Sequence, residues 1–132
     1  MDNDISKMEH ILSILREKNK LMDNLMAFTK EMEKAIDAND LESLGKVLSM
    51  RQESMDKLDM FSEEIKEILS GEGKIFSDNI QSLLDPVVER IKLEDPLEID
   101  IFETNKMAFV TLKKIIALDE TINKRMKQGA PE

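Results

Sequence analysis

Hydrophobic side chains recur every three or four positions through the first third of the chain. One row of such positions contains Ile11, Ile14, Leu21, Leu25, Phe28, Met32 and Ala35, with Lys18 at its one vacant step. A second row lies beside it and contains Met8, Leu12, Leu15, Met22, Met26 and Ile36. This spacing is typical of one helix with two adjacent apolar faces. It predicts a helix over roughly residues 5–37 that packs against two neighbours.

A second helical pattern follows a short interruption at Ala38-Asn39-Asp40. Asn39 with Glu42 three positions later resembles a capping box, which predicts the start of a new helix. Arg51 and Ser62 are the polar steps of this pattern, and its apolar positions are Leu41, Leu44, Leu48, Met55, Leu58, Ile65 and Leu69. We expect a helix over roughly residues 40–69, ended by Ser70-Gly71-Glu72-Gly73. Two long helices joined by a tight turn form an antiparallel hairpin.

The remaining chain predicts a short or broken helix and then a long one. Apolar residues at 75, 76, 80, 83 and 84 favour the short helix within residues 75–92. Asp85-Pro86 and Asp95-Pro96 each place a capping residue before a proline suited to the first helical turn. Asp95 is the better start, because Glu98 stands at the capping-box position. The last helix is expected over residues 96–127, with its inward row at Ile101, Ala108, Leu112, Ile115, Ile122 and Met126.

These patterns predict an all-α fold without strands. The chain lacks Trp and Tyr and has only 3 Pro and 4 Gly, and this composition favours long helices over sheets. Its 132 residues suffice for one domain, expected over residues 1–128 with a frayed tail at 129–132. The expected architecture is an elongated, coiled-coil-like helical hairpin plus a C-terminal helix, in a three- or four-helix bundle. The two Asp-Pro steps leave the topology of residues 74–96 open.

The net charge of the chain indicates which classes of molecule can bind it. The formal net charge of −9 disfavours nucleic acid and anionic lipid, so a protein partner is expected. A basic group at Lys106, Lys113, Lys114, Lys124, Arg125 and Lys127 is interpreted as complementing the helix dipole rather than as a binding patch. No apolar run suggests membrane insertion, and the acidic start Met1-Asp2-Asn3-Asp4 is unlike a signal peptide. The expected location is therefore the cytoplasm.

Catalytic, metal and cofactor sites are not expected. The chain has no cysteine and a single histidine, His10, so thiolate sites and catalytic triads have no residues to form from. Bundles that bind metals through carboxylates need Glu-x-x-His pairs, and Lys7 stands where His10 would need a glutamate. We therefore do not expect an enzyme.

Methionine content and one further stripe point towards protein binding. Most of the ten methionines lie on or beside the apolar rows, and thioether side chains adapt to partners of varied shape. Phe102, Phe109 and Ile116 are spaced by sevens and form a separate stripe on the flank of the last helix. Three occupants can cover this stripe: the chain between residues 75 and 91, a second copy, or an amphipathic helix of a client.

Two segments resemble a known family. The runs AIDANDLESL (residues 35–44) and VLSMRQESM (residues 47–55) resemble the helical hairpin of flagellar type III export chaperones of the FlgN type. The run LKKIIALDETIN (residues 112–123) is similar to part of the C-terminal amphipathic helix of that family. The resemblance covers about two-thirds of the chain. It implies a cytoplasmic chaperone that holds hook-filament junction subunits and delivers them to the export apparatus.

The resemblance also implies that clients bind the C-terminal helix, while the choice of face is inferred from the residues themselves. The predicted client-binding residues are Phe109, Leu112, Ile116, Ile122 and Met126. The alternative function is a structural or regulatory helical homodimer without a role in export. The sequence leaves open which client is bound, the oligomeric state, and whether the last helix docks without a client.

Overall fold

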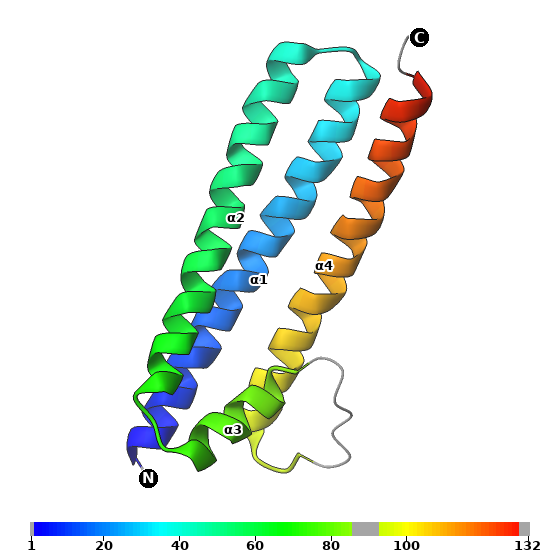
Figure 1. Ribbon diagram of the computed structural model, residues 1–132. Coiled ribbons are helices and arrows are strands. Elements are labelled where there is room, and N and C mark those ends of the chain that lie inside the picture. Colours follow the sequence, from blue (N-terminus) through cyan, green and yellow to red (C-terminus); the bar gives the residue numbers. More distant parts are fainter. Residues whose placement is uncertain (1, 86–92, 130–132) are drawn as a thin grey trace.

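The computed structural model describes residues 2–85 and 93–129. These residues form four helices and no strand: α1 (Asp2–Asp37), α2 (Leu41–Ser70), α3 (Lys74–Leu83) and α4 (Pro96–Gly129). The three long helices run side by side, with α1 between α2 and α4, and the short α3 crosses one end (Figure 1). Helix α1 packs against both α2 and α4. The predicted all-α bundle is confirmed, and so are the two neighbours of the first helix.

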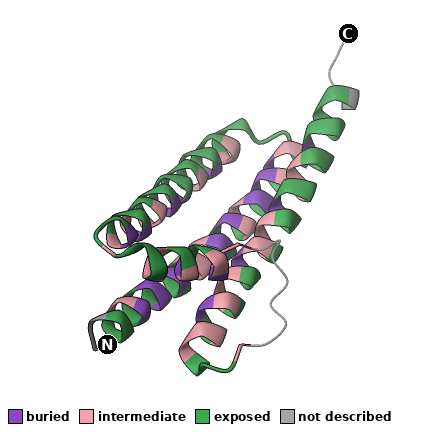
Figure 2. Ribbon diagram, turned by 60° about the horizontal axis from the view of Figure 1, so that its bottom comes forward, coloured by how far each residue is buried: buried purple, intermediate pink, exposed green. Residues whose placement is uncertain are grey.

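The core follows α1 along its length in three apolar clusters. The base cluster, at the α3 end, consists of Met8, Ile11, Leu12, Ile14, Leu15, Ile65, Leu69, Ile80, Leu83 and Ile101. The middle cluster consists of Met22, Leu25, Leu58, Ala108 and Ile115, and the far cluster of Met32, Val47 and Ile122. Buried residues gather on the inner sides of the helices in Figure 2. Helix α4 buries every seventh residue from 101 to 122, which is the repeat of helices packed at a shallow angle.

The turn between α1 and α2 corrects the predicted cap by one residue. Asn39 has a φ of 54°, a left-handed conformation that asparagine tolerates and that ends a helix. Backbone N–H groups of Asn39 and Asp40 donate to the carbonyls of Ile36 (3.1 Å) and Ala35 (2.8 Å) and close α1. Asp40 is the N-cap of α2, and its Oδ1 accepts from the Ser43 backbone N–H at 3.1 Å. The predicted cap at Asn39 is therefore wrong.

The buried row of α2 also differs from the predicted one. Leu41 and Leu48 are exposed by 75% and 44%, and Met55 is exposed as well. Val47 and Ser54, one position earlier than Leu48 and Met55, are buried in their place. Because α2 packs mainly against α1, it buries a narrow strip, and the smaller side chains fit closest to the neighbouring backbone. Leu58, Ile65 and Leu69 are buried as predicted.

The two later helices begin as the sequence indicates. Helix α3 buries Ile80 and Leu83 completely, whereas Ile75 is 90% exposed. Of the predicted helix at 75–92, the part at 86–92 lies outside the described residues. Helix α4 starts at Pro96, and Asp95 Oδ1 accepts from the Leu97 backbone N–H at 2.9 Å, so the predicted start is confirmed. Gly129, predicted in the frayed tail, is helical, and residues 130–132 lie outside the described part.

Within the described ranges, no helix combines the length and apolar content needed to cross a membrane.

Candidate functional site

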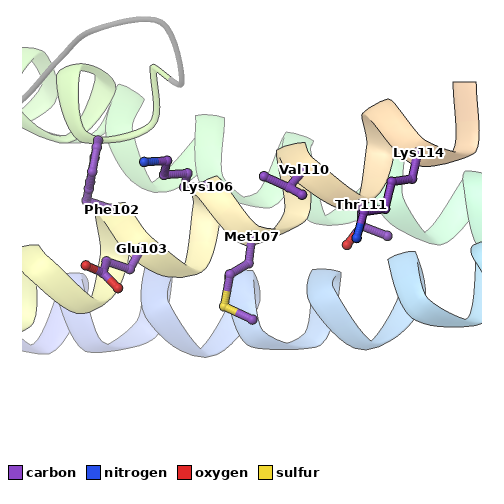
Figure 3. Close-up of a pocket in the computed structure, with 7 residues that line it drawn as sticks. All are labelled: Phe102, Glu103, Lys106, Met107, Val110, Thr111 and Lys114. Carbon is purple, nitrogen blue, oxygen red and sulfur yellow. The ribbon is translucent and has the colours of Figure 1, made fainter. Parts of the chain in front are cut away.

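Helix α4 carries a shallow hollow of about 430 Å³ on its surface. Its lining side chains are Phe102, Glu103, Lys106, Met107, Val110, Thr111 and Lys114, shown in Figure 3 and called here the α4 outer face. Helical geometry explains their placement. The residues at 101, 108, 115 and 122 are in the core, so positions 103 and 110 fall on the opposite side of the same helix and positions 107 and 114 fall on its flank.

The α4 outer face exposes large apolar side chains. Met107 is 64% exposed and Val110 is 45% exposed. Ile116, 48% exposed, lies close by on the stripe of Phe102, Phe109 and Ile116, called here the flanking stripe. None of these three exposed residues belongs to the core clusters, so the described fold does not need them to be apolar. Apolar side chains gathered on one face indicate an interaction surface.

Lysines frame these apolar residues. Lys106 and Lys114 line the hollow, and Lys113 lies between it and the flanking stripe. Among the described residues, no carboxylate lies within ion-pairing distance of these three lysines. Lys106 Nζ instead lies 6.0 Å from the centre of the Phe102 ring, and Lys113 Nζ lies 4.7 Å from that of Phe109. These are cation–π distances, and the ammonium groups stay available to an incoming anion.

The predicted client-binding residues fall in three different environments. Phe109 and Ile116 lie on the flanking stripe, Phe109 half-buried and Ile116 exposed. Leu112 is partly buried against the middle cluster. Met126 is 50% exposed at a groove between α2 and α4. Ile122, only 2% exposed, belongs to the far cluster, so it is a core residue and no part of an exposed face.

The groove beside Met126 is separate from the α4 outer face. It has a volume of about 270 Å³ and is lined by Met32, Ile36, Leu44, Leu48, Arg51, Asp119, Ile122, Asn123 and Met126. Arg51 of α2 donates a hydrogen bond to the Asp119 carboxylate of α4 within it. This ion pair forms a polar part of the groove, and most of the other lining side chains are apolar.

The flanking stripe is covered at one end by the protein's own chain. Phe102 packs against the base cluster, to which α3 contributes Ile80 and Leu83. Ile116, at the other end, stays exposed. The first of the three predicted occupants therefore accounts for part of the stripe, and the remainder adjoins the α4 outer face.

The described residues contain no group of histidine and carboxylate side chains that could hold a metal ion. His10 Nε2 lies 3.4 Å from Glu64 Oε1, and both side chains are largely exposed. This pair sits on the outside of α1 and α2, away from the pockets described above.

Sequence reasoning missed Met107 and Val110 and assigned the neighbouring lysines to the helix dipole. The signal was present in the spacing, because Val110 lies opposite the buried row at 101, 108 and 115 and Met107 lies on the flank of that row. These exposed apolar residues stand next to lysines that have no carboxylate partner. Together, the two features indicate a binding surface more directly than the flanking stripe does.

No protein family model, no curated protein and no solved structure matches this chain.

Proposed function

We propose that this protein is a chaperone that holds an amphipathic helix of another protein against the α4 outer face and the flanking stripe. The observation that carries the proposal is the exposure of Met107, Val110 and Ile116 on a single helix. A client helix would bury these side chains, and its own apolar face would be hidden in return. No covalent step is involved.

The binding free energy expected from these side chains is consistent with reversible binding of a client. Complete burial of one such side chain contributes about 1.5–3 kcal/mol. Met107, Val110 and Ile116 are 64%, 45% and 48% exposed, so each contributes about half of that value and together they give a few kcal/mol. The cost of association is of the order of 4–15 kcal/mol, so further contacts along the client are required. A complex of this kind forms and dissociates readily, as a delivery role demands.

The resemblance of residues 35–55 and 112–123 to FlgN-type chaperones supports a class of client. We propose that the clients are flagellar hook-filament junction subunits, held in the cytoplasm before type III export. Helix α4 is a suitable platform, because Ile101, Ala108 and Ile115 anchor it in the core while its other side stays open.

Light scattering coupled to size exclusion tests this proposal. The protein is run alone and mixed with purified junction subunits, with refractive-index detection because the chain has no Trp or Tyr. The wild type is expected to form a stoichiometric complex, and the double variant Met107→Asp, Val110→Asp is expected to lose it while keeping its helical circular dichroism. A matched control changes Leu41 and Met60, the two most exposed of the large apolar residues of α2, to Asp and should retain binding.

Two results would contradict the proposal. Capture that survives Met107→Asp, Val110→Asp would place the client elsewhere on the bundle. A stable dimer that takes up no junction subunit would favour the structural or regulatory homodimer instead.

A further inference from the structure

The α4 outer face differs from the rest of the molecule in charge. Between residues 102 and 116, three lysines accompany a single carboxylate, Glu103. The whole chain carries a formal net charge of −9, so this face is a local basic region on an acidic protein. The long-range field of the protein is therefore negative, whereas a partner docked on this face meets positive charge.

Several lysines on α1 and α2 have a carboxylate partner, in contrast to those on α4. Lys20 lies 3.1 Å from Glu17, one turn away on α1, and the nearby carboxylate offsets part of its charge. Lys46 and Lys57 of α2 are paired in the same way with Glu42 and Glu53. The α4 lysines at 106, 113 and 114 have no such carboxylate among the described residues, so their charge is left for a partner.

The positions of these lysines define a spacing. Lys106 and Lys114 are eight residues apart, about 12 Å along a helix that rises about 1.5 Å per residue. Met107 and Val110 lie between them (Figure 3). A helix that places apolar side chains on Met107 and Val110 would bring its own flanking residues next to the two ammonium groups.

From this arrangement we infer the chemistry of the partner: the α4 outer face binds an amphipathic helix whose apolar side is flanked by Asp or Glu. The inference rests on the proposed function and specifies the kind of helix that is held. A helix flanked by Lys or Arg would place like charges beside Lys106 and Lys114 and is rejected.

A second copy of the chain also offers an acidic apolar surface. The outer side of α2 has a hollow lined by Asp59, Met60, Phe61, Glu63, Glu64 and Glu67. However, each copy carries a formal net charge of −9, so two copies repel one another as they approach. This repulsion favours a different protein as the occupant.

Two synthetic peptides test the inference. Both carry the same leucine-rich helical face, flanked in one peptide by Glu and in the other by Lys. The wild type is expected to bind the Glu-flanked peptide about two- to thirty-fold more tightly, the range that two partly exposed ion pairs supply. Net charge alone predicts the reverse preference, because the protein is acidic.

Charge reversal localises the effect. Lys106→Glu, Lys114→Glu is expected to abolish or invert the preference. The matched control Lys20→Glu, Lys30→Glu makes the same change in net charge on exposed positions of α1 and should keep the preference.

The outcomes separate the inference from the proposed function. Equal affinity for the two peptides, lost in Met107→Asp, Val110→Asp, contradicts the acidic preference and leaves helix binding at this face intact. Failure of both peptides to bind, or binding that is unaffected by Met107→Asp, Val110→Asp, contradicts the proposed function itself. Self-association of the protein alone, abolished by Glu63→Lys, Glu67→Lys, would show that the occupant is a second copy and would overturn the inference.

Discussion

Arg51 on α2 and Asp119 on α4 form an ion pair across the groove between these helices. Their side chains are 19% and 29% exposed, and Arg51 Nε and Asp119 Oδ1 are buried without a hydrogen-bond partner. Both helices pack mainly on α1, so this pair connects two elements that otherwise share little contact. The change in the free energy of unfolding when this ion pair is removed depends on which side chains replace it.

Removing one partner of this pair is expected to destabilise the fold more than removing both. Arg51→Met or Asp119→Leu alone leaves an unpaired, largely buried charge, which costs about 1–3 kcal/mol. Arg51→Met, Asp119→Leu fills the same space beside Met32 and Leu48 with apolar atoms and should recover most of that loss. Urea unfolding of the four proteins gives the coupling energy, and additive losses in the double variant would contradict this account.

Lys18 is expected to be a destabilising residue at neutral pH. It stands at the polar step of the apolar row on α1, and its Nζ donates to Ser62 Oγ at 3.2 Å. Burial lowers the pKa of Lys18 from its ordinary value of 10.5, so folding disfavours the charged form. Lys18→Met should raise the Tm by a few degrees, while Lys30→Met, on the exposed side of α1, should change it little.

The same lysine predicts a pH dependence. Because the folded-state pKa lies below the unfolded value of 10.5, the unfolded chain binds more protons in the window between the two values. The stability of the wild type therefore gains from Lys18 as pH rises through that window, and the advantage of Lys18→Met should shrink. Thermal melts of both proteins from neutral to alkaline pH measure this difference; a constant difference would contradict the assignment.

Asp40 is expected to stabilise the start of α2 in a pH-dependent way. Hydrogen bonds from the Ser43 hydroxyl and the Ser43 backbone N–H hold the pKa of Asp40 below its ordinary value of 3.8. Its contribution is therefore present above 3.8 and is lost as pH falls through the lower folded-state value. Asp40→Ala should lower the Tm by a few degrees at neutral pH, with the deficit shrinking in acid.

The variant Asp40→Asn distinguishes the effect of the capping hydrogen bond from the effect of the carboxylate charge. Asp40→Asn keeps a side-chain acceptor for the Ser43 N–H and has no proton to gain, so its cap should persist in acid. A Tm deficit of Asp40→Ala that is the same at all pH values would show that the carboxylate charge is irrelevant to the cap.

The sequence predicted the buried face of α1 well, because this helix has neighbours on two sides and both of its apolar rows are visible in the spacing. Helix α4 packs mainly on α1, and its buried residues recur at every seventh position. Helix α2 has one close neighbour, and two rows one residue apart, through Val47 and Leu48, fit the spacing equally well. The packing of α2 against α1 decides which of the two rows is buried.

The candidate site was harder to predict, for a related reason. Ile122 and Ile116 are both isoleucines on the same helix, and which one is buried depends on where α1 lies. Spacing by sevens from Ile101 placed Ile122 in the core, yet its apolar character alone also fitted a binding surface. The free lysines at 106 and 114 could not be recognised, since ion pairing with neighbours is a property of the folded surface.

Methionine-methyl NMR tests most directly whether the α4 outer face is where a client binds. With isotope-labelled methionine methyl groups, Met107 reports on that face, Met60 on the outer side of α2, Met126 on the groove, and Met22 on the core. On addition of a purified junction subunit, the Met107 signal is expected to shift while those of Met60 and Met22 stay in place. An unchanged Met107 signal alongside a shifted Met60 or Met126 signal would contradict the account.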